Sequence, residues 1–372
     1  MMDDSNFKPA RLTDDGKSII DSDGKIVEFD DSRVVFIWPA VSNRNVMKML
    51  EKYFNSWGFK FRRADEISHQ VLQYAKNICS GRECLPFNSI AGSIYKDYIN
   101  NREKDELKIY LFLDQEGPCE NGAWPVILDS FINRNKIKNV IPMLWVSKET
   151  NFFGKGISFA KNFLIPNLLV DIFAEVEGVL DCIAEDKEQA FRIFDEETDK
   201  LVESFCSDYS SLKKSLKKWA LALRKIPLKN NIKKTPKILL HGGLNLQFLY
   251  HPVYDLIRDR GVIIKYSNLI DNLIILVSQM LMRYGYKNLG GKVPSYFSIL
   301  KHLKFLIKYK FLKMFGKVKK IDRENRTAMR SFFALLYMES QVKSFRKIVK
   351  KSGLLFDGAE SFVGIIKEGN KY

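Results

Sequence analysis

Short apolar runs alternate with amphipathic stretches along the chain after residue 32. The stretch Asn43–Gly58 has apolar residues at helical spacing, and Glu66–Asn77 and Asn88–Tyr98 also predict helices. The runs that predict strands are VVFIWPA (34–40), FKFRRA (59–64), KIYLFL (108–113) and VIPMLWV (140–146). Because helices of this length between strands require crossover connections, the pattern indicates an α/β fold with a largely parallel sheet.

The same patterning divides the whole chain into four parts. Residues 1–32 are polar with little periodicity, and we expect a flexible or hairpin-like leader there. Residues 33–157 form the first α/β domain, and residues 158–227 are wholly helical and predict a connector. A Lys-rich, Pro-interrupted linker then leads into KILLHGG, so residues 228–372 predict a second α/β domain built on the same scheme.

Composition narrows the class of protein. The chain has 372 residues, of which 46% are hydrophobic and 13% aromatic, which excludes a mainly disordered or low-complexity protein. No apolar run is long enough to cross a membrane, and the first residues lack the basic and apolar regions of a signal peptide, so we expect a cytoplasmic protein. An odd number of cysteines, five, argues for thiols, metal ligation or redox chemistry and against a disulfide framework.

The formal net charge of +16 is concentrated in one segment. Between Asp271 and Asp322 there is no acidic residue, while the basic helical segment 283–320 carries 11 lysines and arginines. Three interpretations stay open: a solvated face, attraction of CoA phosphates or of an acidic ferredoxin-like donor, and a membrane or nucleic-acid surface. The sequence favours neither nucleic acid nor a membrane as the partner. Phosphate contacts in this segment would be recognised by a steep salt dependence of binding.

Two cysteines lie where a reactive thiol is expected. Cys84 precedes Leu85 and Pro86 on a loop before a helix, where Pro86 favours an extended preceding residue and the positive end of the helix dipole favours a thiolate. Cys119 lies in the turn GPCENG directly after a predicted strand, at the edge where open parallel sheets bind ligands. Buried cysteine is also a common small apolar core residue, which is the favoured interpretation for Cys79, Cys182 and Cys206 and an open one for Cys84 and Cys119.

Histidines add one further candidate. His241, with Gly242 and Gly243, follows a predicted strand and lies at an edge where substrate would bind. His69, His251 and His302 are expected on helix surfaces or in the core. Because the chain has neither a GxGxxG nor a Walker pattern, we expect no ATPase activity in it.

The order of several segments resembles the 2-hydroxyacyl-CoA dehydratase and benzoyl-CoA reductase superfamily, particularly its activase-related branch. The likeness spans roughly residues 33–365, and the segments that carry it are GRECLPF (81–87), GPCENG (117–122), IPNLLVDIFAEVEGVLDCI (165–183) and KILLHGGLNLQFLYHPVYDLIRDRGVII (237–264). The resemblance implies two flavodoxin-like parallel-sheet halves joined by the helical connector. It also implies a [4Fe–4S] cluster held by Cys84 and Cys119, which receives a low-potential electron from an ATP-dependent activator protein and passes it to an acyl-CoA, with a second homologous subunit as a further partner.

Two features depart from the family pattern. GPCENGAW places Glu120 where the family usually has Arg, which puts an anion beside a cluster ligand. The family's third cysteine follows a helix like GAESFVGIIKEG (358–369) in a PFxCxP-like motif, and this sequence ends at Tyr372, where that motif would begin. Three explanations stay open: a truncated chain, a third thiolate supplied by a partner or by Cys79, and a degenerate site. In the last case the chain is a non-catalytic subunit or docking module.

Overall fold

The computed structural model describes nine stretches of the chain, and every structural statement below concerns them. They are residues 7–39, 43–63, 68–100, 105–112, 120–144, 153–205, 209–240, 252–266 and 340–355. By their internal contacts the residues divide into two compact units, one made of 1–266 with 345–357 and the other of 267–344 with 358–372. The second unit, including the basic segment 283–320, lies outside the described residues except for residues 340–344.

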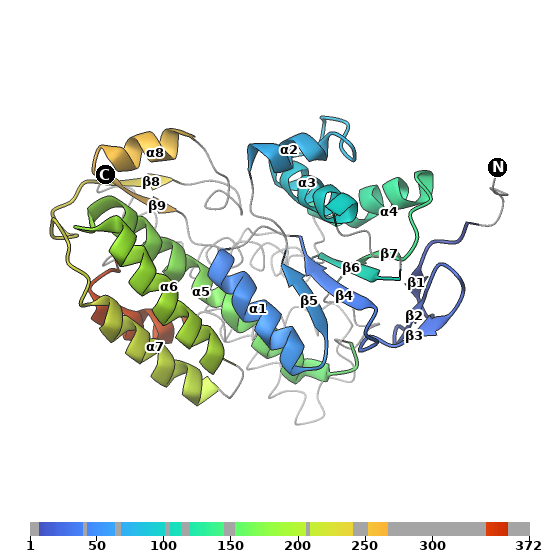
Figure 1. Cartoon of the computed structure of the whole chain (residues 1–372), viewed down its shortest axis with the longest axis horizontal. Coiled ribbons are helices and arrows are strands. Elements are labelled where there is room, and N and C mark those ends of the chain that lie inside the picture. The colour runs from blue at the N-terminus through green and yellow to red at the C-terminus, as the bar shows by residue number, and fades with distance from the viewer. Residues whose placement is uncertain are drawn as a thin grey trace, which may run out of the picture. The chain divides into compact units, whose positions relative to one another are not determined.

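A four-stranded parallel sheet organises the first half of the chain (Figure 1). Its strands β4 (Val34–Trp38), β5 (Lys60–Arg63), β6 (Leu107–Phe112) and β7 (Val140–Leu144) lie in the order β5-β4-β6-β7. All three neighbouring pairs are parallel, with Phe36 opposite both Phe61 and Ile109. The predicted parallel α/β sheet is therefore confirmed for this part of the chain.

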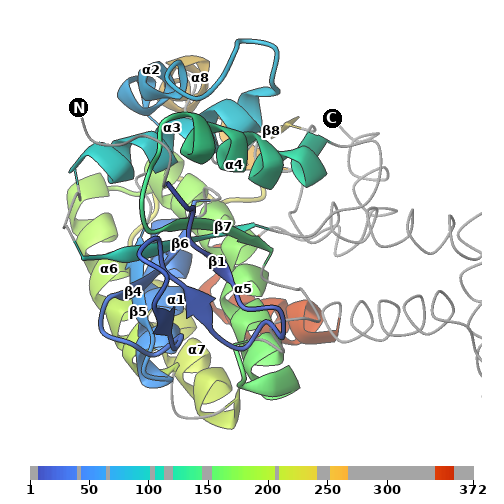
Figure 2. The same ribbon diagram turned by 90° about the vertical axis from the view of Figure 1, so that its right-hand side faces the viewer.

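Helices cover both faces of this sheet (Figures 1 and 2). On one face, Val35, Ile37, Tyr110 and Phe112 share a buried cluster with residues of two helices, α3 (Leu85–Asn100) and α4 (Trp124–Arg134). Alternate residues of β4 point to the other face, where Phe36 contacts Phe54 of α1 (Arg44–Ser56) at a ring-centroid distance of 5.4 Å. The short α2 (His69–Ala75) begins three residues later than predicted, because Ser68 caps it by accepting the backbone N–H of Val71.

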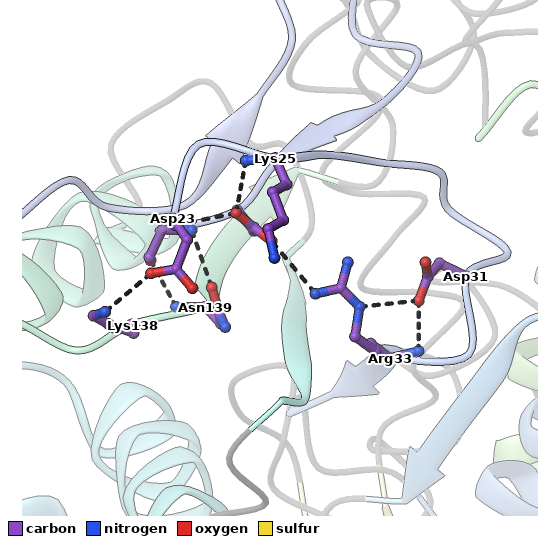
Figure 3. A network of polar contacts seen from close by, with 8 residues as sticks. Asp23, Lys25, Asp31, Arg33, Lys138 and Asn139 are labelled. Carbon is purple, nitrogen blue, oxygen red and sulfur yellow. Dashed lines mark hydrogen bonds and ion pairs between the residues drawn. The ribbon is translucent and has the colours of Figure 1, made fainter.

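The residues before β4 form a small antiparallel sheet. Its strands are β1 (Arg11–Leu12), β2 (Ile19–Ile20) and β3 (Ile26–Val27), and Ile19 and Val27 are buried. Figure 3 shows how the turn between β2 and β3 contacts the turn before β7. There Asp23 pairs with Lys138 at 3.0 Å, and Ser22 and Asn139 exchange two hydrogen bonds of 3.0 and 2.9 Å.

Three helices follow β7, in the stretch that the periodicity predicts to be helical. They are α5 (Gly156–Ile183), α6 (Lys187–Ser204) and α7 (Tyr209–Leu223). Trp219 of α7 is almost fully buried, contacts Phe173 and Phe194, and donates from Nε1 to Thr198 Oγ1 at 2.9 Å. The α6 helix is also joined to α1 by three ion pairs at four-residue spacing, namely Arg44–Asp195, Lys48–Asp199 and Lys52–Glu203.

A second parallel strand pair begins after the helices. It consists of β8 (Lys237–Leu240) and β9 (Ile263–Tyr266), with α8 (Pro252–Asp259) between them in the sequence. Further along, Arg346, which precedes the 3-10 turn η4 (Lys350–Ser352), forms a buried two-bond pair with Glu175 of α5 at 2.8 and 3.2 Å. None of the described helices has the length and apolar character needed to cross a membrane.

Candidate functional site

The candidate site lies where α3 and α4 begin. Each of these helices precedes a strand of the parallel sheet, α3 leading to β6 and α4 to β7. A crossover helix runs antiparallel to the strands, so both helices start at the carboxyl edge of the sheet. This is the edge where ligands bind in open α/β sheets, because helix N-termini and strand ends converge there.

Cys84 is the residue immediately before α3. The backbone N–H of Asn88 donates to the Cys84 carbonyl at 3.1 Å, which is the first hydrogen bond of the helix. The Asn88 side chain reinforces this turn by donating to the carbonyls of Glu83 and Cys84 at 2.9 and 3.0 Å. The thiol is therefore held at the positive end of α3, in accord with the prediction of a thiol beside a helix N-terminus.

The expected extended conformation before Pro86 is wrong. The helix begins at Leu85 and not at Asn88, so Pro86 occupies the second helical position. Proline is tolerated in the first turn because the N–H it lacks would have no partner within the helix. The consequence is that Cys84 lies one turn closer to the helix than the sequence suggested.

The turn between Cys79 and Cys84 is closed by hydrogen bonds to the carboxylate of Glu83, a residue of the same turn. Glu83 accepts hydrogen bonds from the backbone N–H groups of Ser80, Gly81 and Arg82 and from the Ser80 hydroxyl, all at 3.0 to 3.1 Å. The backbone hydrogen bond from Ser80 is the main cause that lowers the pKa of Glu83. Gly81 has a φ of +89°, a conformation that glycine adopts without strain. The backbone N–H groups of this turn thus form an anion-binding site, and the carboxylate of Glu83 occupies it.

Cys79 is a poor donor for a metal. The half-buried thiol has its pKa raised to about 12 by burial, and by the negative charges of Glu83 and Cys84. A thiol ligates metals as thiolate, so this environment opposes the predicted role of Cys79 as a third ligand.

Two aromatic rings join the starts of α3 and α4. Phe87 in the first turn of α3 stacks on Trp124, the first residue of α4, with a centroid distance of 5.5 Å and an interplanar angle of 27°. Cys84 and Cys79 pack against the same apolar cluster. Cys119 itself lies outside the described residues, but it directly precedes Glu120, where the 3-10 turn η2 (Glu120–Ala123) begins and leads into α4. Cys84 therefore adjoins the start of α3, which contacts the start of α4, and α4 begins five residues after Cys119 in the sequence.

Trp124 adds a feature that the sequence did not reveal. Its side chain is only 8% exposed, and among the described residues its Nε1–H has no hydrogen-bond partner. A buried donor without an acceptor costs about 1–3 kcal/mol, so native structures seldom keep one. An acceptor supplied by a bound group would remove that cost.

These residues fit an iron–sulfur cluster in part. A cysteine at the N-terminus of α3 suits an anionic cluster, and an unpaired N–H suits its sulfur atoms, which accept hydrogen bonds in such sites. The described residues contain no group of three His, Cys, Asp or Glu side chains that could hold a metal ion. A third thiolate has to come from residues beyond this set or from a partner.

The remaining candidates are distributed elsewhere or cannot be placed. His241, Gly242 and Gly243, together with Cys206, His251 and His302, lie outside the described residues. His69 is exposed at the start of α2, where its Nε2 lies 2.9 Å from Gln73 Nε2. Cys182 is buried in α5, and burial raises its pKa, as expected for a core thiol.

Comparison with known proteins found no family model, no curated protein and no solved structure that matches this chain.

Proposed function

We propose that the chain is a cytoplasmic iron–sulfur protein of the acyl-CoA dehydratase and reductase type. The observation that carries the proposal is the stack of Phe87 on Trp124, which brings together the helix starts that follow Cys84 and Cys119. The strand order β5-β4-β6-β7 supports it, because an order with the first strand between the second and third is that of flavodoxin-like sheets. A matching second half, with His241, Gly242 and Gly243 at the substrate edge, belongs to the same proposal.

Each part of the site then has a defined task. Cys84 and Cys119 hold a [4Fe–4S] cluster together with one thiolate from another part of the chain or from a second homologous subunit. When bound, the cluster supplies a low-potential electron, received from an ATP-dependent activator, for an acyl-CoA thioester. The α3 dipole stabilises the Cys84 thiolate, and the Phe87 and Trp124 rings keep water from that side of the cluster.

Iron binding by cysteine variants tests the proposal. The protein is purified anaerobically, reconstituted with iron and sulfide, and examined by electron paramagnetic resonance after reduction. We expect Cys84→Ala and Cys119→Ala each to lower bound iron by more than half, whereas Cys182→Ala, which removes a buried thiol of α5, leaves it unchanged. Equal iron in all three variants, or none in the folded wild type, contradicts the proposal.

A second candidate function is an interaction module that has lost the cluster. Two features favour the interaction module: the raised pKa of Cys79 and the occupation of its turn by the Glu83 carboxylate. Both oppose Cys79 as a third thiolate ligand of a cluster. With a pKa of about 12, Cys79 should react with iodoacetamide at pH 9 on the order of several hundred-fold more slowly in the folded chain than in urea.

Cluster reconstitution combined with this alkylation rate separates the two functions. A slow rate together with no bound iron in the folded protein supports the interaction module. Iron that depends on Cys84 and Cys119 supports the electron-transfer protein even when Cys79 is inert.

A further inference from the structure

The outward face of α7 carries a line of positive charge. Its exposed positions Lys214, Lys217 and Lys218 recur at helical spacing, and Arg224 and Lys225 just beyond the helix end extend the line. We refer to these five residues as the α7 cationic stripe. The opposite side of the helix is fixed in the protein, because Leu212, Leu216, Trp219, Ala220 and Leu223 are buried.

The cations of the stripe lack the acidic partners that other helices provide. On α1, Arg44, Lys48 and Lys52 are each paired with an acid of α6. Among the described residues no ion pair involves any member of the stripe. The surrounding sequence explains the difference, since residues 209–254 include ten lysines and arginines and neither Asp nor Glu.

The stripe is a surface distinct from the cysteine site. It comes from α7 and the residues that follow it, and the main packing partners of α7 are α6 and η4. In both views α7 is separated from α3 and α4, where the cysteine site lies (Figures 1 and 2). A partner bound by the stripe is therefore independent of the proposed electron-transfer role.

The chemistry of the stripe selects among anionic partners. Lysine is a compact charge on a flexible chain and suits phosphates without reading their surroundings. The stripe has no aromatic residue on which a base could stack, and among the described side chains the only large exposed apolar one of α7 is Leu221, 42% exposed, so single strands and membrane insertion are both disfavoured. At about 1.5 Å per residue, the charges from 214 to 225 extend along roughly 17 Å.

We propose that the α7 cationic stripe binds the sugar–phosphate backbone of a nucleic-acid duplex without sequence preference. The apolar side of α7 is packed against the protein, so the helix presents only its exposed face, where flexible cations suit phosphate oxygens. Five phosphate contacts predict that log K falls with log[salt] with a slope of about −4 to −5. The predicted binding is therefore tight at low salt and weak at high salt.

The test uses the full chain and a labelled DNA duplex of about 20 base pairs, with binding measured by fluorescence anisotropy at several salt concentrations. The variant Lys214→Gln/Lys217→Gln/Lys218→Gln should reduce the steepness of the slope by about 2 to 3 and weaken binding at least about tenfold at 0.1 M salt. The control Lys25→Gln/Lys60→Gln/Lys76→Gln removes the same charge from exposed lysines elsewhere and should change the slope by less than about 0.5. Circular dichroism of both variants shows whether the fold is intact.

Several results overturn the proposal. An unchanged slope in the α7 variant means that the phosphate contacts lie elsewhere, for example in the basic segment 283–320. Tighter binding to a single strand than to the duplex, or binding only to phosphatidylserine vesicles, means that another anion is the partner. Binding that does not depend on salt excludes phosphate contacts altogether.

Discussion

The polar groups at the two edges of the four-stranded sheet differ in whether they have partners within the protein. At the amino edge, Asp21 accepts from the backbone N–H of Lys25 and pairs with Arg33 at 3.4 Å, and Asn139 accepts from the backbone N–H of Ser22, 117 residues away in the sequence (Figure 3). At the carboxyl edge, Trp124 keeps a buried N–H that no described residue accepts. Polar groups matched within the chain contribute to stability, whereas an unmatched one is a position where a bound group can supply the missing partner.

The most heavily matched polar cluster lies beside the first residues of β6. Arg62 binds Glu106 through two bonds of 2.7 and 2.9 Å and pairs with Asp97 at 2.7 Å. Tyr110 donates to Asp97 at 2.8 Å, and Lys108 Nζ lies 3.7 Å from both carboxylates. Burial raises the pKa of Tyr110 well above its ordinary value and lowers that of Lys108. Two cations and two anions balance here, so the cluster has no charge left for a ligand.

The largest effect is expected from Arg62→Met. The substitution leaves two buried carboxylates facing a single lysine, and it should lower the free energy of unfolding by about 3 to 4 kcal/mol. Urea denaturation measures the change. The control Arg63→Met removes the exposed pair with Glu51 at 2.9 Å and should cost less than about 1 kcal/mol. Equal losses of unfolding free energy in the two variants would contradict the view that this cluster stabilises the fold.

Gly92→Ala tests the packing that supports the carboxyl edge. A Cβ at position 92 would lie 1.9 Å from the Val71 carbonyl oxygen and 2.8 Å from its carbon, so α2 would have to move away from α3. We expect a loss of about 2 to 3 kcal/mol. Gly178→Ala in α5 is the matched control, because its Cβ would meet Ile264 O at 3.5 Å, an ordinary contact. That variant should be neutral or slightly stabilising, and thermal unfolding distinguishes the two.

The sequence was informative where the contacts are local. Apolar spacing predicted the four strands, the helices near α1, α2 and α3 and the helical stretch after residue 158, since burial of one face sets that spacing, but α4 was not predicted. It could not predict the Arg62 cluster, because Arg62 and Glu106 are 44 residues apart and meet only through the sheet. The Glu83 turn and the unpaired Trp124 N–H were missed for a different reason, because both depend on the direction in which side chains point. Cys84 was predictable as a helix-start thiol, and the core interpretation favoured for Cys79 agrees with the burial that raises its pKa.

At the amino edge, Asp21→Asn should have a smaller effect. Burial opposes the charge of Asp21, but backbone N–H groups of Lys25 and Asp23 and the Arg33 guanidinium lower its pKa overall. A carboxyl group with a lowered pKa stabilises the fold above its ordinary value of 3.8, and this contribution is lost as the pH falls through the folded value. The variant should lose about 1 to 2 kcal/mol at pH 7 and show a flatter decline of stability below about pH 4. An unchanged acid profile would show that this network is not matched as described.

The smallest effect, and the sharpest contrast between the two edges, is expected from Trp124→Phe. Two buried tryptophans differ in one respect: Trp219 donates from Nε1 to Thr198, whereas Trp124 Nε1 has no acceptor among the described residues. In the metal-free protein, the cavity left by Trp124→Phe is offset by removal of an unpaired donor, so stability should change by less than about 1 kcal/mol. Trp219→Phe loses both volume and a hydrogen bond, and should cost about 2 to 3 kcal/mol.

After reconstitution with iron and sulfide, Trp124→Phe should have the larger effect of the two variants, on the reduction potential of the cluster. If the Trp124 N–H donates to a cluster sulfur, Trp124→Phe lowers the reduction potential of the bound cluster, because the lost hydrogen bond had stabilised the more negative, reduced state. Trp219→Phe should leave that potential unchanged, since Trp219 packs between α5 and α6. An identical potential in wild type and Trp124→Phe would show that the indole does not contact the cluster, even where the iron content depends on Cys84. A large loss of stability in metal-free Trp124→Phe would show instead that the N–H already has an acceptor within the protein.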